Sequence, residues 1–448
     1  MRKVLTLSAL TFALISQTQA ADNLEQAFKD GKASGQIRAF YIDRNYSGFS
    51  TATSYHRNAL ALGGYLKYET APLFGLSAGV AAYTTHKMDK KSSTAGQNDT
   101  TLFGSNGDNT TYLGEAYLQY KYENTTLKAG RQKLDTPMAG SDDARELPNL
   151  FEAYVLSNTD IKDTTLIAAH ITKFAAGTFA NAYASNGNYA SKVLSLTSGY
   201  SFVDDITQYT SHFTNMGTYA IGEKNKGVTA VGAIYSGIAG LKLQLWDYYA
   251  YDILNAIYAE ANYETKLSDG MSIYSGAQYI REDDVGDKYA GKVKSNFIAA
   301  KVGAKFNNFD LSFALSHNSK DSGATINGGT ITPWGGMPAY TQGMVTRHQF
   351  MAGTDAWKVA GNYNWKDFGA NVNTALYYAE FDMDKLNDYS DAAAADKASE
   401  YGLDVIYSPE AVKNLQLRFR ANFPRHYKET VAGNIGWDEY RFIANYNF

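Results

Sequence analysis

The carboxyl-terminal segment constrains the fold of this chain more than any other feature. Apolar and polar residues alternate over residues 440–448, and Ile443 is the one exception on the polar face. The apolar face comprises Tyr440, Phe442, Ala444, Tyr446 and Phe448. Since a β-strand has a period of two residues, the pattern predicts a strand with one apolar and one wet face. A membrane barrel needs such a terminal strand, which faces lipid and pairs with the first strand; the edge strand of a soluble sheet is the alternative.

The amino terminus has the three parts of a bacterial secretory signal peptide. Arg2 and Lys3 form a basic region, residues 4–15 are apolar, and Thr18-Gln19-Ala20 is a small-polar-small cleavage site. The apolar part is too short to cross a bilayer as a helix. We therefore predict that residues 1–20 are removed and that residues 21–448 form a single domain. A short buried amino-terminal helix is the alternative.

The composition favours a membrane barrel over a soluble protein. The chain has 35 Tyr, 22 Phe and 39 Gly, but only 7 Pro and no Cys. Aromatic residues in such numbers suit two girdles at the membrane interfaces. Without cysteine no disulfide framework is possible, so a closed sheet must provide the stability. The net charge of −4 excludes the basic footprint of a nucleic-acid-binding protein.

Alternating segments recur along the chain as hairpins with short turns at one end and long polar connections at the other. The predicted strands are residues 35–44, 58–69, 75–86, 112–122, 126–133, 151–158, 164–174, 227–236, 241–250, 253–264, 271–281, 296–307, 309–317, 356–366, 369–381, 400–407, 415–423 and the terminal segment. The pattern predicts an all-β fold, a closed antiparallel transmembrane β-barrel of about 18 strands. Residues 191–216 are either a further transmembrane hairpin, which would make roughly 20 strands, or part of an external loop.

Alternation also assigns four arginines to the water-filled lumen. They are Arg38 on the first strand, Arg418 and Arg420 on the penultimate strand and Arg441 on the last. These strands are neighbours in a closed barrel, so the arginines should line one continuous wall. A guanidinium binds a carboxylate through two hydrogen bonds, and a row of them lets an anion step along the pore. Alternatively, the arginines only neutralise lumenal acids or extend from strand ends to water.

Further charged residues are predicted to lie in the lumen. The basic candidates are Lys128, Arg131, Lys242, Lys301, Lys305 and Lys358, and the acidic candidates are Glu115, Glu260, Glu264 and Asp404. The long connection 134–150 holds Asp142, Asp143, Arg145 and Glu146. If this connection folds into the barrel, its acids face the arginine wall and create a transverse field in a narrow pore. A solvated external loop is the alternative.

Four segments resemble the OprD-type family of bacterial outer-membrane porins. They are residues 35–41 (Gly-Gln-Ile-Arg-Ala-Phe-Tyr), residues 127–132 followed by Asp142, Arg145 and the Leu-Pro-Asn-Leu-Phe stretch 147–151, residues 252–263 and residues 438–446. The resemblance implies an outer-membrane barrel of 18 strands with an inward-folded third loop. It also implies passive, selective uptake of amino acids, small peptides or small carboxylates along lumenal basic residues. The chain departs from the family at Glu146, which replaces an apolar residue, and at the extra length of residues 176–226.

Membrane and assembly partners follow from the barrel. We expect outer-membrane lipid, lipopolysaccharide, small solutes and the barrel-assembly machinery, which would engage the terminal strand ending in Phe448. Nucleic acid is not expected as a partner, and a monomer and a trimer are both open. No cofactor or metal site is expected.

Other functions have weaker signals. Ser316 and His317 are the one hint of an outer-membrane hydrolase, and no phosphate loop, zinc spacing or Gly-x-Ser-x-Gly elbow is present. The acidic run at Asp382, Asp384, Asp388 and Asp391 lacks the spacing of a calcium loop. We therefore expect no enzymatic activity. The remaining alternative is an outer-membrane anchor or adhesive protein with a plugged barrel, although so wide a lumen is hard to fill with side chains alone.

Overall fold

The computed structural model describes residues 21–48, 55–88, 98–179, 210–336, 338–384, 396–430 and 433–448. The predicted signal peptide, residues 191–209 of the ambiguous hairpin, and Asp388 and Asp391 lie outside the described residues. Two α-helices, α1 (Leu24–Lys29) and α2 (Met216–Ile221), have six residues each. In the part of the chain that the structure describes, no helix is long and apolar enough to cross a membrane.

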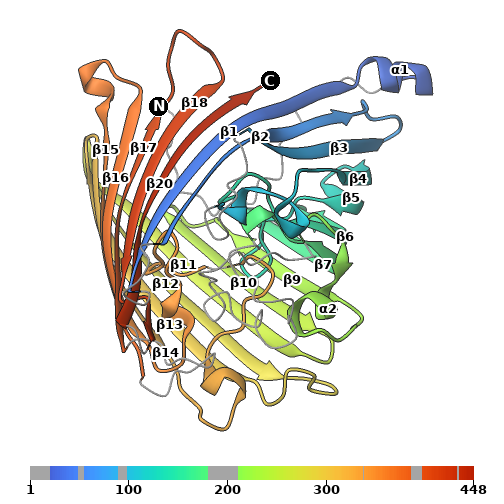
Figure 1. The fold of residues 1–448 in the computed structure, drawn as a ribbon. Helices are drawn as coiled ribbons and strands as arrows, with labels where there is room; N and C mark the ends of the chain where they lie inside the picture. The colour runs from blue at the N-terminus through green and yellow to red at the C-terminus, as the bar shows by residue number, and fades with distance from the viewer. Residues whose placement is uncertain are drawn as a thin grey trace.

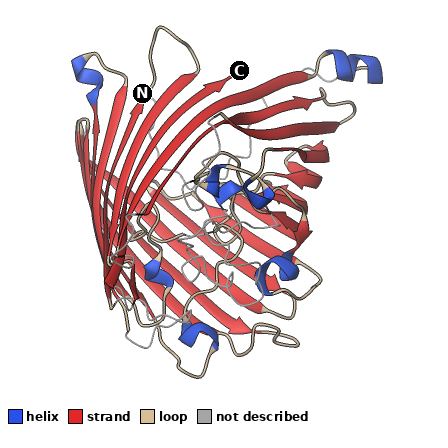
Figure 2. Cartoon of the chain, viewed as in Figure 1, coloured by secondary structure: helices blue, strands red, loops and turns tan. Residues whose placement is uncertain are grey.

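A closed antiparallel β-barrel forms the body of the protein (Figure 1, Figure 2). Its 20-stranded sheet includes two short strands, β8 (Thr214–Asn215) and β19 (Lys428–Thr430), so that 18 long strands form the wall. The long strands are β1 (Lys32–Ser47), β2 (Tyr55–Glu69), β3 (Leu76–Lys87), β4 (Thr110–Tyr122), β5 (Thr125–Gln132), β6 (Leu150–Asn158), β7 (Thr164–Ala175), β9 (Val228–Tyr235), β10 (Leu241–Ala250), β11 (Leu254–Ser268), β12 (Met271–Asp284), β13 (Lys294–Phe306), β14 (Phe309–Asn318), β15 (Asp355–Asn364), β16 (Val372–Asp382), β17 (Lys397–Tyr407), β18 (Leu415–Arg425) and β20 (Gly433–Asn447). The predicted fold class and strand number are confirmed.

The two faces of each strand differ as the alternation predicted. On β14, Leu311, Phe313 and Leu315 are exposed on the outside of the barrel. Ser316, the next residue after Leu315, is buried on the inside. Large apolar side chains on the outer surface are costly in water but favourable against hydrocarbon. The outer surface of the wall is therefore suited to lipid.

The terminal strand closes the barrel. Strand β20 pairs with β1 from Gln36↔Asn447 to Ser47↔Gly436, and with β18 on its other edge. Gly35 and Phe448 exchange two further backbone hydrogen bonds of 2.9 and 3.1 Å. From Glu439 to Tyr446 both edges of β20 are paired, which is required of backbone surrounded by lipid.

Strand β7 pairs directly with β9, from Thr164↔Tyr235 to Ile171↔Val228. No further hairpin is inserted between these two strands, so the wall has 18 long strands rather than 20. Of the ambiguous segment, the described part holds the short strand β8, which pairs with Lys173 and Phe174 at the end of β7.

Two long connections lie inside the barrel. In residues 133–149, which we call the inner loop, Met138 and Leu147 are buried. In residues 319–354, which we call the second loop, Trp334 and Phe350 are buried in the same apolar cluster as Met138. The sequence predicted the second loop only as a long polar connection. The structure differs, because apolar residues of this loop are buried inside the barrel. Together the loops fill part of the lumen.

Closure by β20 predicts that a proline within this strand prevents barrel formation. Ala444→Pro removes a donor from a strand that is paired on both edges, so most of the protein should run as unfolded polypeptide on a gel without heating. Ala444→Val, which keeps the donor and adds an apolar methyl pair to the lipid face, should retain the heat-dependent shift in mobility. Equal mobility of the two variants would contradict this role of β20.

Candidate functional site

A buried cluster of charges lies where β20 meets the inner loop. Glu439 of β20 is surrounded by Arg44 of β1, Arg145 of the inner loop and Arg441 of β20. Arg145 Nη2 lies 2.9 Å from Glu439 Oε1, and Arg44 Nε lies 3.3 Å from Oε2. All four side chains have an exposed fraction of 0%. Arg44 also lies 3.0 Å from the buried carboxylate of Asp99. Because an unpaired buried charge costs several kcal/mol, Glu439 is needed to keep the guanidiniums of Arg145 and Arg441 in place.

The four predicted arginines lie on three adjacent strands. Arg420 of β18 is opposite Arg441 of β20, and Arg38 lies on β1, the other neighbour of β20. Arg418 and Arg420 both contact Asp404 of β17, with Arg418 Nε 2.7 Å from Oδ1 and Arg420 Nε 3.4 Å from Oδ2. Their side chains are 29% and 17% exposed, whereas Arg441 is fully buried. Arg418 and Arg420 are therefore the members of the set most open to the lumen.

Arg38 attaches the inner loop to the wall. Its Nη1 donates to Asp143 Oδ1 at 2.7 Å and to the carbonyl oxygens of Arg145 at 2.6 Å and Glu146 at 3.2 Å. Burial acts to raise the pKa of Asp143, but the charges of Arg38 and Lys133 outweigh it, so this pKa lies below its ordinary value. Of the loop acids, Asp143 contacts the arginine wall, whereas Asp142 lies 3.5 Å from Arg347 of the second loop.

Glu146 of the inner loop differs from its neighbours. Its side chain is 1% exposed, and neither carboxyl oxygen has a hydrogen-bond partner among the described residues. Burial raises its pKa to about 8, although the charge of Arg38 acts in the opposite direction. The group is therefore mostly protonated at neutral pH. It lies against Gly63 of β2, where a Cβ atom would approach Oε1 to 2.6 Å.

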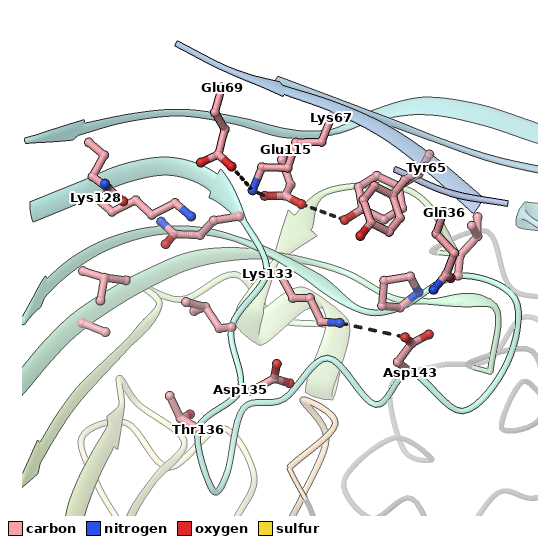
Figure 3. Close-up of a pocket in the computed structure, with 18 of the residues that line it drawn as sticks. Gln36, Tyr65, Lys67, Glu69, Glu115, Lys128, Lys133, Asp135, Thr136 and Asp143 are labelled. Carbon is pink, nitrogen blue, oxygen red and sulfur yellow. Dashed lines mark hydrogen bonds and ion pairs between the residues drawn. The ribbon is translucent and has the colours of Figure 1, made fainter. Parts of the chain in front are cut away.

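A cavity of about 400 Å³ lies between the inner loop and strands β1 to β7 (Figure 3). It extends toward the short turns, since its lining includes Glu69 and Ser157 near the ends of β2 and β6. Lys67 lies 3.3 Å from Glu115 and 3.4 Å from Glu69. Lys128 Nζ lies 3.7 Å from the centre of the Tyr117 ring. The cavity therefore carries charges of both signs.

The remaining predicted residues lie on another part of the inner wall. Lys305 contacts Glu264 at 2.8 Å, and Lys301 lies 4.1 Å from the ring centre of Tyr340 in the second loop. The other members are Lys358, which donates to the Gln342 carbonyl, Glu260, which accepts from Gln244 and Gln278, and Lys242, opposite Asn262. Apart from Lys358, whose charge interacts with that of Arg420, these residues lie on strands β10 to β13, which do not neighbour the strands of the arginines.

The prediction that Arg131 faces the lumen is wrong. Lys128 and Gln132 line the cavity, and the intervening odd-numbered position points to the opposite face of β5. Arg131 stacks on Phe213 with a distance of 4.4 Å to the ring centre, and lies 3.8 Å from Glu152. Lys128 and Arg131 are three residues apart, so a regular strand cannot direct both inward.

Carboxylates of the wall also hold the second loop, which the sequence did not reveal. Glu400 of β17 accepts the backbone N–H groups of Met344 and Thr346 at 2.7 Å each, and Glu282 of β12 accepts that of Ile331 at 2.7 Å. Arg347 of this loop lies 3.5 Å from Asp142. Alternation assigns both glutamates to the lumen, but it cannot indicate which loop they receive.

The Ser316–His317 pair does not form a catalytic arrangement. Ser316 is buried and exchanges a 2.7 Å hydrogen bond with Thr341 inside the barrel, whereas His317 is half-exposed outside and contacts Asp355 at 2.8 Å. Adjacent residues of a strand point to opposite faces, so the hydroxyl and the imidazole are on opposite sides of the wall.

Comparisons with known proteins agree with this architecture. Residues 26–448 match the model of the family described as outer membrane porin, OprD family. Among solved structures, OpdK of Pseudomonas aeruginosa with vanillate has 16% identity and a TM-score of 0.72, covering 94% of this chain and 99% of that one. OccK9 (OpdG) of P. aeruginosa has 20% identity and a TM-score of 0.72, covering 95% and 100%. OccK2 (OpdF) of P. aeruginosa in complex with glucuronate has 18% identity and a TM-score of 0.68, covering 94% and 98%. No curated relative matches the chain.

Burial of Glu146 predicts a pH-dependent stability. The unfolded chain releases this proton near the ordinary pKa of 4.5, whereas the folded protein holds it up to about 8. Stability should therefore be complete below the first value and fall, by on the order of 2–4 kcal/mol, as pH rises through this window. Urea unfolding in lipid at about pH 4 and pH 9 should show that Glu146→Gln removes much of the loss. Glu123→Gln in the exposed β4–β5 turn is the control, and equal pH dependence of both variants would contradict the assignment.

Proposed function

The chain belongs to the OprD family of outer-membrane porins, and from this premise we propose that it admits small hydrophilic solutes that carry a carboxylate. Amino acids, short peptides and small carboxylates fit this description. The protein is a channel of the bacterial outer membrane, and the transport we propose is passive diffusion. Two structural neighbours were solved with the carboxylates vanillate and glucuronate, which is consistent with this class of solute.

The observation that supports the proposal best is the excess of positive charge at Arg418 and Arg420. These two guanidiniums share the single carboxylate of Asp404, so one positive charge is not balanced within the group. Both side chains are partly open to the lumen. An incoming carboxylate can accept hydrogen bonds from such a pair and leave again, since each guanidinium keeps its contact with Asp404.

The inner loop supports selectivity by narrowing the pore beside these arginines. Arg38 and the Arg145–Glu439 pair attach it to the wall formed by β1 and β20. The charge of Arg418 also contributes to the low pKa of Asp143, which indicates that the loop acid and the arginine wall are close enough to interact. Opposed charges across a narrow passage create a transverse field that orients a zwitterion or an anion.

We further propose that the terminal strand serves assembly as well as closure. It ends in Phe448, which is 51% exposed on the barrel surface. An exposed aromatic residue at the end of the closing strand is a suitable feature for the barrel-assembly machinery to bind before β20 pairs with β1. In the folded protein the outer surface then contacts lipid and lipopolysaccharide.

Planar-bilayer recordings in a salt gradient test the proposed selectivity. The native protein should show discrete current steps with a preference for anions, because Arg418 and Arg420 attract them. Replacing both by alanine should lower the anion-to-cation permeability ratio by roughly two- to fivefold and keep the steps. Lys413→Ala in the exposed β17–β18 turn removes one positive charge outside the lumen and should leave the ratio unchanged.

Two results would contradict the proposal in different ways. An unchanged ratio in the double variant would mean that the arginine wall does not set selectivity. Folded native protein that gives no current steps would favour the alternative of a plugged barrel that acts as an anchor or adhesive protein.

A further inference from the structure

Two side chains that line the 400 Å³ cavity, Glu146 and Lys128, form no hydrogen bond or ion pair with another residue that the structure describes. We infer that this cavity binds a short peptide, whose amino-terminal ammonium lies at Glu146 and whose carboxylate lies at Lys128. The inference rests on the proposed function and selects one solute class, because it assigns both charged ends of the solute.

Glu146 supplies one end of the site. Its carboxyl is buried and lines the cavity, yet it makes no hydrogen bond to any described residue. Leaving a buried polar group unsatisfied costs free energy, which a ligand that donates hydrogen bonds recovers. An ammonium group donates three and favours the ionised carboxylate. Asp143, which also lines the cavity, adds negative charge on the same side.

Lys128 supplies the other end. Within the described ranges, no carboxylate lies within salt-bridge distance of its ammonium, whose observed contact is the face of the Tyr117 ring at 3.7 Å. The neighbouring Lys67 differs, since Glu115 and Glu69 both lie within 3.4 Å of it. Lys128 can therefore receive the carboxylate of a solute without breaking an existing ion pair.

The separation of the two ends favours a peptide over a single amino acid. Tyr117 is opposite Gly79, and Gly79 is opposite Glu69, so the ring beneath Lys128 lies level with Glu69 of β2. Glu146 lies against Gly63 of the same strand. At roughly 3.3 Å per residue these positions are about 20 Å apart along β2. Allowing for the reach of the two side chains, an extended peptide of about four residues, spanning roughly 14 Å, fits between them.

The other charged groups that line the cavity are already paired. Facing Glu146 are Arg38 from β1, Lys67 from β2 and Asp143 from its own loop, together with the Tyr65 and Tyr83 hydroxyls from β2 and β3. Arg38 contacts Asp143, and Lys67 contacts Glu115, which also accepts from Tyr83. Of the remaining lining charges, Lys133 lies 3.9 Å from Asp143, Glu69 lies 3.4 Å from Lys67, and Asp135 accepts from the Ser141 backbone N–H. Without Glu146 and Lys128 the lining thus has three cations and four carboxylates, so a solute with one positive and one negative end fits better than a net anion.

Titration calorimetry on the folded, full-length protein in detergent tests the site with tetraalanine. Glu146→Gln and Lys128→Met should each weaken tetraalanine binding about tenfold. N-acetyl-tetraalanine, which lacks the ammonium, should bind native protein and Glu146→Gln equally. Tetraalanine amide, which lacks the carboxylate, should bind native protein and Lys128→Met equally. Near pH 7, binding of tetraalanine should release up to one proton, seen as a dependence of the heat on the buffer.

The controls are Glu123→Gln and Lys162→Met, in short turns outside the cavity. Both should bind tetraalanine as native protein does. Because Gln is isosteric with the protonated Glu146, this variant should fold, and Lys128→Met tests the same site without altering the loop. Heat-dependent gel mobility reports folding for each sample.

Three results would overturn the inference. One is tetraalanine binding that neither cavity variant weakens, and another is L-alanine binding as tightly as tetraalanine. A third is a loss of affinity that is equal for tetraalanine and its N-acetyl form in Glu146→Gln. Current steps recorded from the same preparations separate this from the proposed function: if the steps persist while any of these results is found, the porin function stands and the peptide site does not.

Discussion

The contact between Glu439 and three arginines connects the closure of the barrel to the position of the inner loop. Arg44 and Arg441 come from β1 and β20, the two strands that close the wall, and Arg145 comes from the loop. The backbone ladder of β20 would form without these side chains, but the loop has no covalent link to this part of the wall. The ion pairs between this buried carboxylate and the guanidiniums are hard to break, because each charge left unpaired in the interior would cost several kcal/mol of free energy. Glu439 therefore joins the two closing strands to the inner loop, which Arg38 also attaches to the wall through Asp143.

Buried wall carboxylates also hold the loops in the rest of the lumen. Both inward loops are polar, and wall carboxylates fix them by accepting hydrogen bonds: Glu400 and Glu282 receive backbone N–H groups of the second loop. Because Glu400 and Glu282 bind the second loop, Arg418 and Arg420 have only the carboxylate of Asp404 as an ion-pair partner among the described residues. Glu146 is the exception, since it is buried in the inner loop without an anchor role or a partner among the described residues.

Much of the fold could be predicted from alternation, because a barrel strand must present one face to lipid and one to water along its whole length. All 18 long strands were identified in this way, and the terminal strand indicated closure. The error at Arg131 came from assigning two positions of opposite parity to one face. Applied consistently, alternation would also have placed Arg44 and Glu439 in the lumen. The contacts of the loops could not be predicted, since Glu400 and Met344 meet through the path of a long loop that has no periodic pattern.

The most direct test of this account is the single-channel conductance of Glu439→Gln in planar bilayers. The substitution keeps the shape of the side chain but removes the charge that Arg145 and its neighbours share. We expect a larger conductance with frequent fluctuations, because the inner loop loses one of its attachments to the wall. Glu380→Gln, beside Tyr378 on β16, should match the native protein. A steady conductance of native size in folded Glu439→Gln would contradict the claim that this carboxylate positions the loop.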